Sequence, residues 1–332
     1  MIEDRMANGR PWLVADIGGT NARFGWVDDG GAVDQIHKLA AADYAGPAEA
    51  VQAYLVLVQQ ALGAAYRPPR RAAFALATAL DGDEVMLTNS HWRFSRAALQ
   101  AALGLDVLLL LNDFEALALS LPRLGPTQWR VFGAPQPQPR GTLAVIGPGT
   151  GLGVGGVTQT ALGWVALPGE GGHATLAPAD DFESALLQHV RGRFEHVSAE
   201  RLLSGIGLPE LHDAVAAVLG QPAGAPLAAE AIVERALAGG DAVCERTIDA
   251  FCALLGGFAG NVALTLGARG GVYIGGGIVP RLGERFFGSR FRERFEAKGR
   301  FRAYLEPIPT ALITDTLAAL SGAALAIEQL ET

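Results

Sequence analysis

The stretch WLVADIGGTNARFGWVDDGG, residues 12–31, combines two apolar segments with a glycine turn and one carboxylate. An apolar run ends at Asp16, passes Gly18 and Gly19, and resumes after a Thr-Asn pair as alternating residues that reach a DDGG turn. Alternation of apolar and polar residues is typical of half-buried strands, so we predict a β-hairpin here. A hairpin needs only the turn, so the aspartate and the Thr-Asn pair require a separate explanation.

Composition limits the class of protein. The chain has 332 residues, half of them hydrophobic, which predicts two domains, and its net charge of −8 argues against nucleic acid or an anionic membrane as a partner. The first ten residues lack the apolar core of a signal peptide, and apolar runs such as DVLLLLN are too short to span a bilayer. Cys244 and Cys252 show no metal-ligand spacing, which indicates a reduced cytosolic location without a structural zinc.

Helical and strand patterns alternate along the rest of the chain. We expect helices over residues 47–65, 95–104 (capped by Ser95), 113–122, 180–194, 198–205, 241–268 and 316–330, and strands over 71–78, 82–92, 106–111, 270–274 and 310–314. This alternation predicts α/β domains with partly parallel sheets. Residues 132–141, FGAPQPQPRG, predict a loop or domain boundary, and the last strand and helix are expected to cover the first domain.

A second strand-glycine-strand unit occupies residues 142–160, TLAVIGPGTGLGVGGVTQT. At an offset of 130 residues, Gly149 and Thr150 align with Gly19 and Thr20. We interpret the pair of units as the trace of a duplication.

Three glycine-rich loops, at residues 18–20, 147–153 and 275–277, each follow an apolar strand. Glycine turns let backbone N–H groups approach a phosphate closely, and one such loop alone is more often a tight turn. Three together favour a nucleotide site. The P-loop signature is excluded, because no lysine follows the glycines.

The segment GLGVGG, residues 151–156, matches the dinucleotide pattern GxGxxG, which requires a helix directly after it. The following residues alternate like a strand, so a dinucleotide fold is disfavoured. A protein kinase is disfavoured as well, because neither HRD nor DFG occurs.

Six further segments carry a family resemblance: DIGGTNARFGW, LNDFEALAL, GPGTGLGVG, LPGEGGH, HVSAERLLSG and GGVYIGGGIVPR. In this order the chain resembles bacterial glucokinases of the hexokinase/actin-like superfamily, roughly over residues 12 to 327. The resemblance implies a two-domain, actin-like (ribonuclease H-like) α/β ATPase fold with an inter-domain cleft. The implied small domain is 1–122 plus 312–332, and the large domain is 123–311. One departure is Thr78, where similar proteins usually carry proline.

The resemblance also assigns a nucleotide site for ATP. The implied ligands are Asp16, Gly18, Gly19, Thr20, Asn21, Gly149, Thr150, Gly151, Gly275, Gly276 and Gly277. In the family the first hairpin is a phosphate loop whose aspartate, here Asp16, orders Mg²⁺ through water. The alternative is that Asp16 only caps the turn.

The implied glucose ligands are Asn112, Asp113, Glu170, His173 and Glu200, with Asp113 as the general base that activates the 6-hydroxyl. Each has a structural alternative. Asp113 could cap the helix that begins at Phe114, His173 could hydrogen-bond a loop, and Glu200 could be a surface residue near the start of its helix. Glu170 has flanking glycines, and such a stretch gains little from a buried carboxylate without a ligand.

We therefore expect an ATP- and Mg²⁺-dependent glucokinase of glycolysis that forms glucose 6-phosphate and acts as a cytoplasmic homodimer. A kinase for another hexose, such as fructose or mannose, remains an alternative, because discrimination depends on single hydroxyl contacts. A catalytically silent sugar-sensing regulator would lack the base or add a DNA-binding segment. An actin-like filament or chaperone ATPase would hydrolyse ATP without sugar.

Overall fold

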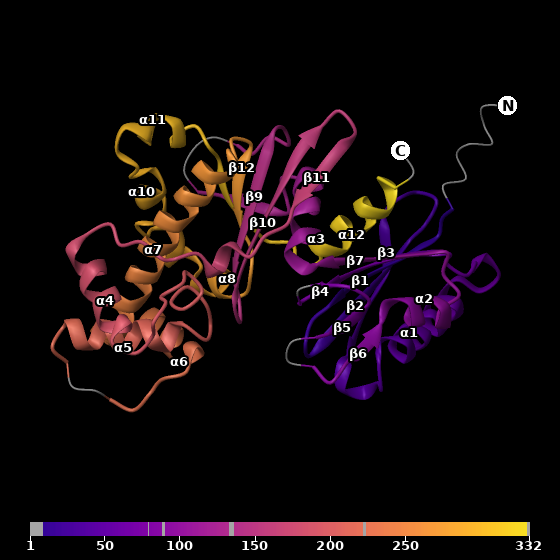
Figure 1. The fold of residues 1–332 in the computed structure, drawn as a ribbon, viewed down its shortest axis with the longest axis horizontal. Coiled ribbons are helices and arrows are strands. Elements are labelled where there is room, and N and C mark those ends of the chain that lie inside the picture. Colours follow the sequence, from indigo (N-terminus) through magenta and orange to yellow (C-terminus); the bar gives the residue numbers. More distant parts are fainter. Residues whose placement is uncertain (1–8, 79, 88–89, 133–135, 222–223, 331–332) are drawn as a thin grey trace. The chain divides into compact units, whose positions relative to one another are not determined.

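The computed structural model describes residues 9–78, 80–87, 90–132, 136–221 and 224–330, and they group into two compact units (Figure 1). Unit 1 contains the residues up to Leu124, Gln159–Pro168 and the residues from Thr316 onward. Unit 2 contains Gly125–Thr158 and Gly169–Asp315. The domain boundaries expected from the sequence, after residues 122 and 311, stay a prediction.

Unit 1 is a five-stranded sheet with helices on both faces. Its elements are β1 (Trp12–Ile17), β2 (Asn21–Val27), β3 (Val33–Ala40), α1 (Pro47–Leu62), β4 (Arg71–Leu76), β5 (Glu84–Met86), β6 (Arg93–Ser95), α2 (Arg96–Ala102), β7 (Val107–Asn112), α3 (Asp113–Ser120), β11 (Gly163–Leu167) and α12 (Ala318–Glu328). The strand order of the sheet is β3-β2-β1-β4-β7. The β1–β2 pair is antiparallel, which confirms the predicted hairpin, whereas β1–β4 and β4–β7 are parallel.

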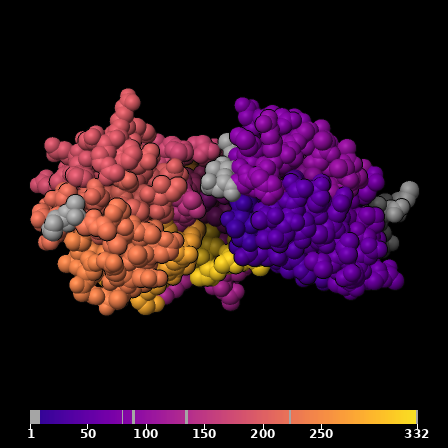
Figure 2. Space-filling view, turned by 90° about the horizontal axis from the view of Figure 1, so that it is seen from below, coloured from indigo at the N-terminus to yellow at the C-terminus, as the bar shows by residue number. Residues whose placement is uncertain are grey.

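Alternate residues of β1 enter two separate cores. Leu13 and Ala15 lie in the core that includes Tyr54 of α1, whereas Trp12 and Val14 lie in the core that includes residues of α12. Figure 1 shows α1 and α2 on one side of this sheet and α3 and α12 on the other. In Figure 2 the surface of unit 1 consists mainly of indigo and purple, N-terminal residues. Because β1 is buried on both faces, its sequence is almost continuously apolar.

Unit 2 repeats this strand arrangement. Its elements are β8 (Trp129–Val131), β9 (Thr142–Pro148), β10 (Leu152–Thr160), α4 (Asp181–Arg191), α5 (Leu208–Val218), α6 (Ala229–Ala238), α7 (Ala242–Leu266), β12 (Gly271–Ile274), α8 (Ile278–Leu282), α9 (Glu284–Phe287), α10 (Phe291–Glu296), α11 (Arg302–Leu305) and β13 (Thr310–Ile313). Among the strands of unit 2 the order is β10-β9-β12-β13-β8. The β9–β10 hairpin is antiparallel and β9–β12–β13 is parallel, as in β2-β1-β4-β7. The repeated order supports the duplication inferred from the glycine spacing.

Helix α7 is the central helix of unit 2. Its 25 residues are long and apolar enough to cross a membrane, so the expectation that every apolar segment is too short was wrong for this one. We interpret α7 as a core helix, because 78% of its apolar window is buried inside the structure. Its apolar residues pack on all sides, which is typical of the interior of a large domain.

Two other expectations were wrong. Residues 198–205 form turns instead of a helix. A helix would have the Gly205 N–H donate to the Arg201 carbonyl, but this N–H donates to the Gly149 carbonyl outside the segment. The strand at 310–314, β13, pairs with β12 and β8 in unit 2, so only α12 returns to unit 1. The loop expected over 132–141 lies partly outside the described residues, and residues 136–141 contain neither helix nor strand.

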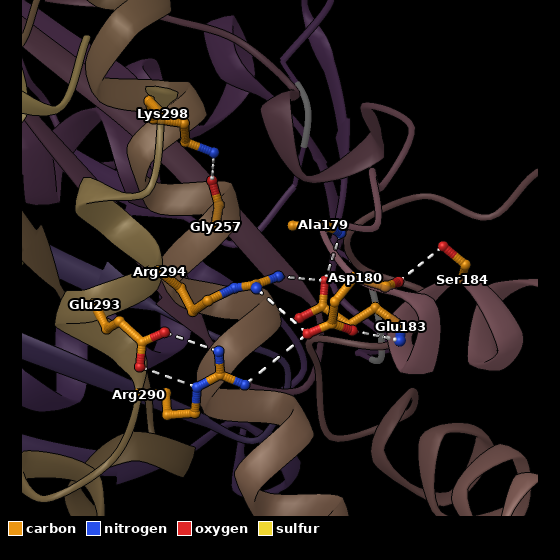
Figure 3. Close-up of polar contacts among 9 residues, drawn as sticks. All are labelled: Ala179, Asp180, Glu183, Ser184, Gly257, Arg290, Glu293, Arg294 and Lys298. Carbon is orange, nitrogen blue, oxygen red and sulfur yellow. Dashed lines mark hydrogen bonds and ion pairs between the residues drawn. The ribbon is translucent and has the colours of Figure 1, made fainter. Parts of the chain in front are cut away.

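A buried ion cluster joins α4 to α10 in unit 2 (Figure 3). Arg294 Nη2 lies 2.6 Å from Glu183 Oε2, and the two side chains are 7% and 3% exposed. Arg294 also lies 3.4 Å from Asp180, the residue that caps α4. Two helices far apart in the chain are therefore linked by a buried pair, Arg294 and Glu183, and by the 37% exposed Asp180.

Candidate functional site

The first glycine loop connects β1 to β2 in unit 1. Gly18 N–H donates to the Asn21 carbonyl at 2.9 Å and closes the turn. Asp16 lies opposite Arg23 in the ladder, and Arg23 Nη1 donates to Asp16 Oδ2 at 3.1 Å. Burial raises the pKa of Asp16, while the Arg23 guanidinium acts in the opposite direction. The Asp16 carboxylate is therefore paired with an arginine on the facing strand, which the sequence analysis had missed.

The candidate base lies at the same edge of the unit 1 sheet. The parallel registers align Ile17 with Leu76 and Leu76 with Asn112, so β1, β4 and β7 end at the same level of the sheet. In such sheets ligands bind at the carboxyl ends of the strands. Asp16 and the Asn112–Asp113 pair are thus brought to one edge, although about a hundred residues separate them.

The cap of α3 is Asn112, whereas from the sequence Asp113 was considered as a possible cap. Asn112 Oδ1 accepts the Phe114 N–H at 2.9 Å, and Glu115 completes a capping box. Asp113 is the first helical residue, and its Oδ1 also lies 2.9 Å from the Phe114 nitrogen. The positive end of the helix dipole favours the ionised carboxylate at this position.

Thr78 contributes to the position of Asn112. The Asn112 Nδ2 group donates to the Thr78 carbonyl at 3.3 Å, and the Thr78 hydroxyl donates to the Met86 carbonyl at 2.9 Å. The residue that departs from the family pattern therefore makes a hydrogen bond that proline could not make.

The second and third glycine loops lie together in unit 2. β9 and β12 are parallel neighbours, and Gly275 N–H donates to the Ile146 carbonyl at 2.8 Å. Gly276 has a φ of +74°, and a Cβ there would overlap the Pro148 carbonyl, so this position requires glycine. The loops meet because the two strands end at the same edge of the sheet.

A cavity of about 610 Å³ opens beside these loops. Its lining includes Gly149 and Thr150 from the second loop and Gly277 from the third. Ile206, Glu230 and Arg281 also line the cavity, and the sequence analysis named none of them. Arg281 ends the family motif GGVYIGGGIVPR, whereas no motif marks Ile206 or Glu230, which turns and helices distant in the sequence bring to the cavity.

Three candidate glucose ligands also belong to unit 2. Glu170 precedes a 3₁₀ turn, Gly171–His173, and both Glu170 and His173 are exposed. From the sequence, a buried carboxylate between glycines was taken to indicate a ligand; this reasoning does not apply to Glu170, because its side chain is exposed. His173 Nδ1 lies 3.9 Å from Glu200 Oε1, which brings two of the three residues together. Glu200 lies in a turn, so its expected place near the start of a helix was wrong.

Comparison with known proteins decides the family. A glucokinase family profile matches residues 13–330. The chain belongs to the glucokinase family. The resemblance inferred from the motifs is confirmed, and so is the two-domain actin-like fold.

Members of the glucokinase family resemble this chain over nearly its full length. The glucokinase of Chromobacterium violaceum is 51% identical over 95% of this chain and 88% of its own. That of Aromatoleum aromaticum is 49% identical over 96% and 95%. The crystal structure of glucokinase from an Antarctic psychrotroph is 38% identical, with a TM-score of 0.88 over 96% of this chain and 98% of that one.

Proposed function

We propose that this glucokinase-family chain transfers the γ-phosphoryl group of ATP to the 6-hydroxyl of glucose. The observation that carries the proposal, beside the family, is the cavity lined by Gly149, Thr150 and Gly277. Two glycine loops, expected from the sequence to bind one nucleotide, line one cavity. Backbone N–H groups at glycine turns provide the donors that phosphate oxygens require.

In this proposal the nucleotide ligands are those expected from the sequence. Gly149, Thr150, Gly151 and the loop Gly275–Gly277 act from unit 2, while Gly18, Gly19, Thr20 and Asn21 act from the first hairpin. The exposed Ile206, which lines the same cavity, provides apolar surface for the base.

Magnesium fits the carboxylate at the end of β1. Among the described residues no cluster of three or more His, Cys, Asp or Glu side chains could hold a metal. Mg²⁺ does not need one, because it keeps several waters and binds chiefly to substrate phosphates. Asp16 is partly buried, and its carboxylate pairs with Arg23. This carboxylate would hold such an ion through water. When bound, the ion neutralises charge on the phosphates.

Glucose recognition in this proposal uses Asn112, Asp113, Glu170, His173 and Glu200. Carboxylates, an amide and an imidazole match a ligand whose surface is mostly hydroxyl groups, and the wrong sugar would leave them without partners. Asp113 accepts the proton of the 6-hydroxyl as that oxygen attacks the phosphorus in line. The protein otherwise acts by positioning the two substrates.

We further propose a homodimer in the reducing cytosol, without nucleic acid or membrane partners, whose product enters glycolysis. Both cysteines, Cys244 and Cys252, are buried thiols, which agrees with a reducing compartment. Light scattering on the purified protein tests the dimer directly.

An ADP-release assay across a panel of hexoses tests the function. With ATP and Mg²⁺ we expect glucose to be phosphorylated far better than galactose or N-acetylglucosamine, since each differs at a group that the site would bind. Equal turnover of all three sugars would contradict the glucose assignment. Preference for fructose or mannose would assign the enzyme to another hexose.

A further inference from the structure

The carboxylate of Glu200 lies between the two loops of unit 2 to which the proposed function assigns different ligands. Its Oε2 accepts the N–H of Leu152, directly after the second glycine loop, at 2.8 Å. Its Oε1 faces His173, whose Nδ1 is 3.9 Å away. The side chain is 33% exposed, so part of the carboxylate is open to a ligand. One oxygen thus faces the proposed sugar site and the other the nucleotide loop.

The turn that carries Glu200 binds both loops through its backbone as well. Gly205 N–H donates to the Gly149 carbonyl at 2.7 Å, and Ile206 N–H donates to the Thr150 carbonyl at 3.3 Å. At the other end of the turn, Glu200 N–H donates to the Gly172 carbonyl at 2.9 Å. Residues 200–206 therefore form a continuous connection from the sugar loop to the phosphate loop.

Gly151 leaves the space that this arrangement requires. A Cβ at Gly151 would lie 2.5 Å from Glu200 Oε2, which is too close for any real contact. Its φ lies outside the left-handed region, so an alanine could adopt the backbone conformation. The glycine is needed for the close approach of the carboxylate and not for a special turn geometry.

We propose that Glu200 is a positioning residue that couples glucose binding to nucleotide binding, an inference that rests on the proposed function. A glucose hydroxyl that donates to Oε1 holds the carboxylate in place. The same carboxylate then holds the Leu152 N–H through Oε2, and with it the loop Gly149–Gly151. Without sugar the partly exposed side chain rotates away more easily, and the loop loses this support. By linkage, the nucleotide must strengthen glucose binding by the same factor.

Calorimetric titration with the non-hydrolysable analogue AMPPNP and Mg²⁺ tests the coupling. The measured quantity is the ratio of the nucleotide Kd without glucose to that with saturating glucose. In the wild type we expect a ratio of about 5 or more, the lower end of typical couplings. Glu200→Gln should bring the ratio close to 1, because its single amide oxygen cannot accept from both Leu152 and the sugar. Gly151→Ala should do the same by displacing the carboxylate.

Glu195→Gln is the matched control, because it removes one negative charge at an exposed position five residues before Glu200. It should keep the wild-type ratio. A purely structural role for Glu200 would weaken both affinities and leave the ratio unchanged, and that result in both test variants would overturn the proposal. A wild-type ratio of 1 would overturn it too. If the wild type bound no glucose or no nucleotide, the proposed function itself would fail.

Discussion

Asp113 is the residue at which the proposed chemistry and the local fold can be separated. Its neighbour Asn112 caps α3 and receives the Phe114 N–H, so the helix does not depend on Asp113 for its cap. A carboxylate in the first turn adds only about 0.3–1 kcal/mol through the helix dipole. The charge at this position is therefore more important for function than for stability.

Asp113→Asn should lower kcat by roughly 10²–10⁴-fold, because an amide cannot accept the proton of the sugar hydroxyl. The melting temperature should change little, since the capping box of Asn112 and Glu115 stays intact. Steady-state kinetics and thermal unfolding measure the two effects. A folded variant that retained more than about a tenth of the wild-type kcat would show that the base lies elsewhere.

A buried ion pair, Glu183 and Arg294, lies between the helices α4 and α10. Arg294 has two carboxylate partners, Asp180 and Glu183, and Glu183 also accepts the Ala179 N–H at 2.8 Å (Figure 3). Burial raises the pKa of Glu183, and the Ala179 N–H and Arg294 oppose this rise. Removal of one member of a buried pair leaves the other charge without compensation.

Arg294→Met should lower the free energy of unfolding by about 3–5 kcal/mol at neutral pH. A carboxyl with a raised pKa stabilises the fold below its ordinary pKa and loses that contribution as the pH rises through the folded value. The variant lacks Arg294, one of the groups that lower the pKa of Glu183. Its loss in free energy of unfolding relative to the wild type should therefore grow as the pH rises above 4.5, the ordinary pKa of a glutamate. Denaturant unfolding of variant and wild type at several pH values measures the difference.

The double variant Glu183→Gln with Arg294→Met is the control for this prediction. The glutamine oxygen can still accept the Ala179 N–H, and no buried charge remains, so most of the stability should return. A double variant as unstable as Arg294→Met alone would show that packing, and not charge, holds α4 against α10.

At the scale of the whole molecule, the two units share one strand order, and each carries part of the proposed glucose site. Asn112 and Asp113 belong to unit 1, whereas Glu170, His173 and Glu200 belong to unit 2. If all five bind one sugar, glucose must affect both units.

Hydrogen exchange tests this division. Saturating glucose should slow amide exchange at residues 113–116 of unit 1 and at residues 171–174 of unit 2, because a ligand that binds only the folded arrangement suppresses local opening. Galactose at the same concentration is the control and should protect neither segment. Protection in unit 2 alone would remove Asn112 and Asp113 from the glucose ligands.

Local patterns determined much of what the sequence predicted. The β1–β2 hairpin, the strand at 106–111, the Ser95 cap and the long helix α7 all follow from periodicity and capping residues within one short segment. The family resemblance, carried by motifs in order, added the actin-like fold and the glucokinase assignment. These features need no knowledge of distant contacts.

The tertiary structure decided everything that depends on residues far apart in the chain. Residues 198–205 have a helical pattern but form turns, and the Gly205 N–H donates to the carbonyl of Gly149 in a distant loop instead of to Arg201. The contact between Glu200 and Leu152 spans 48 residues, and although each residue lies in a family motif, neither motif predicts that the two meet. Local propensity is worth a fraction of a kcal/mol per residue, so a few hydrogen bonds to distant segments outweigh it.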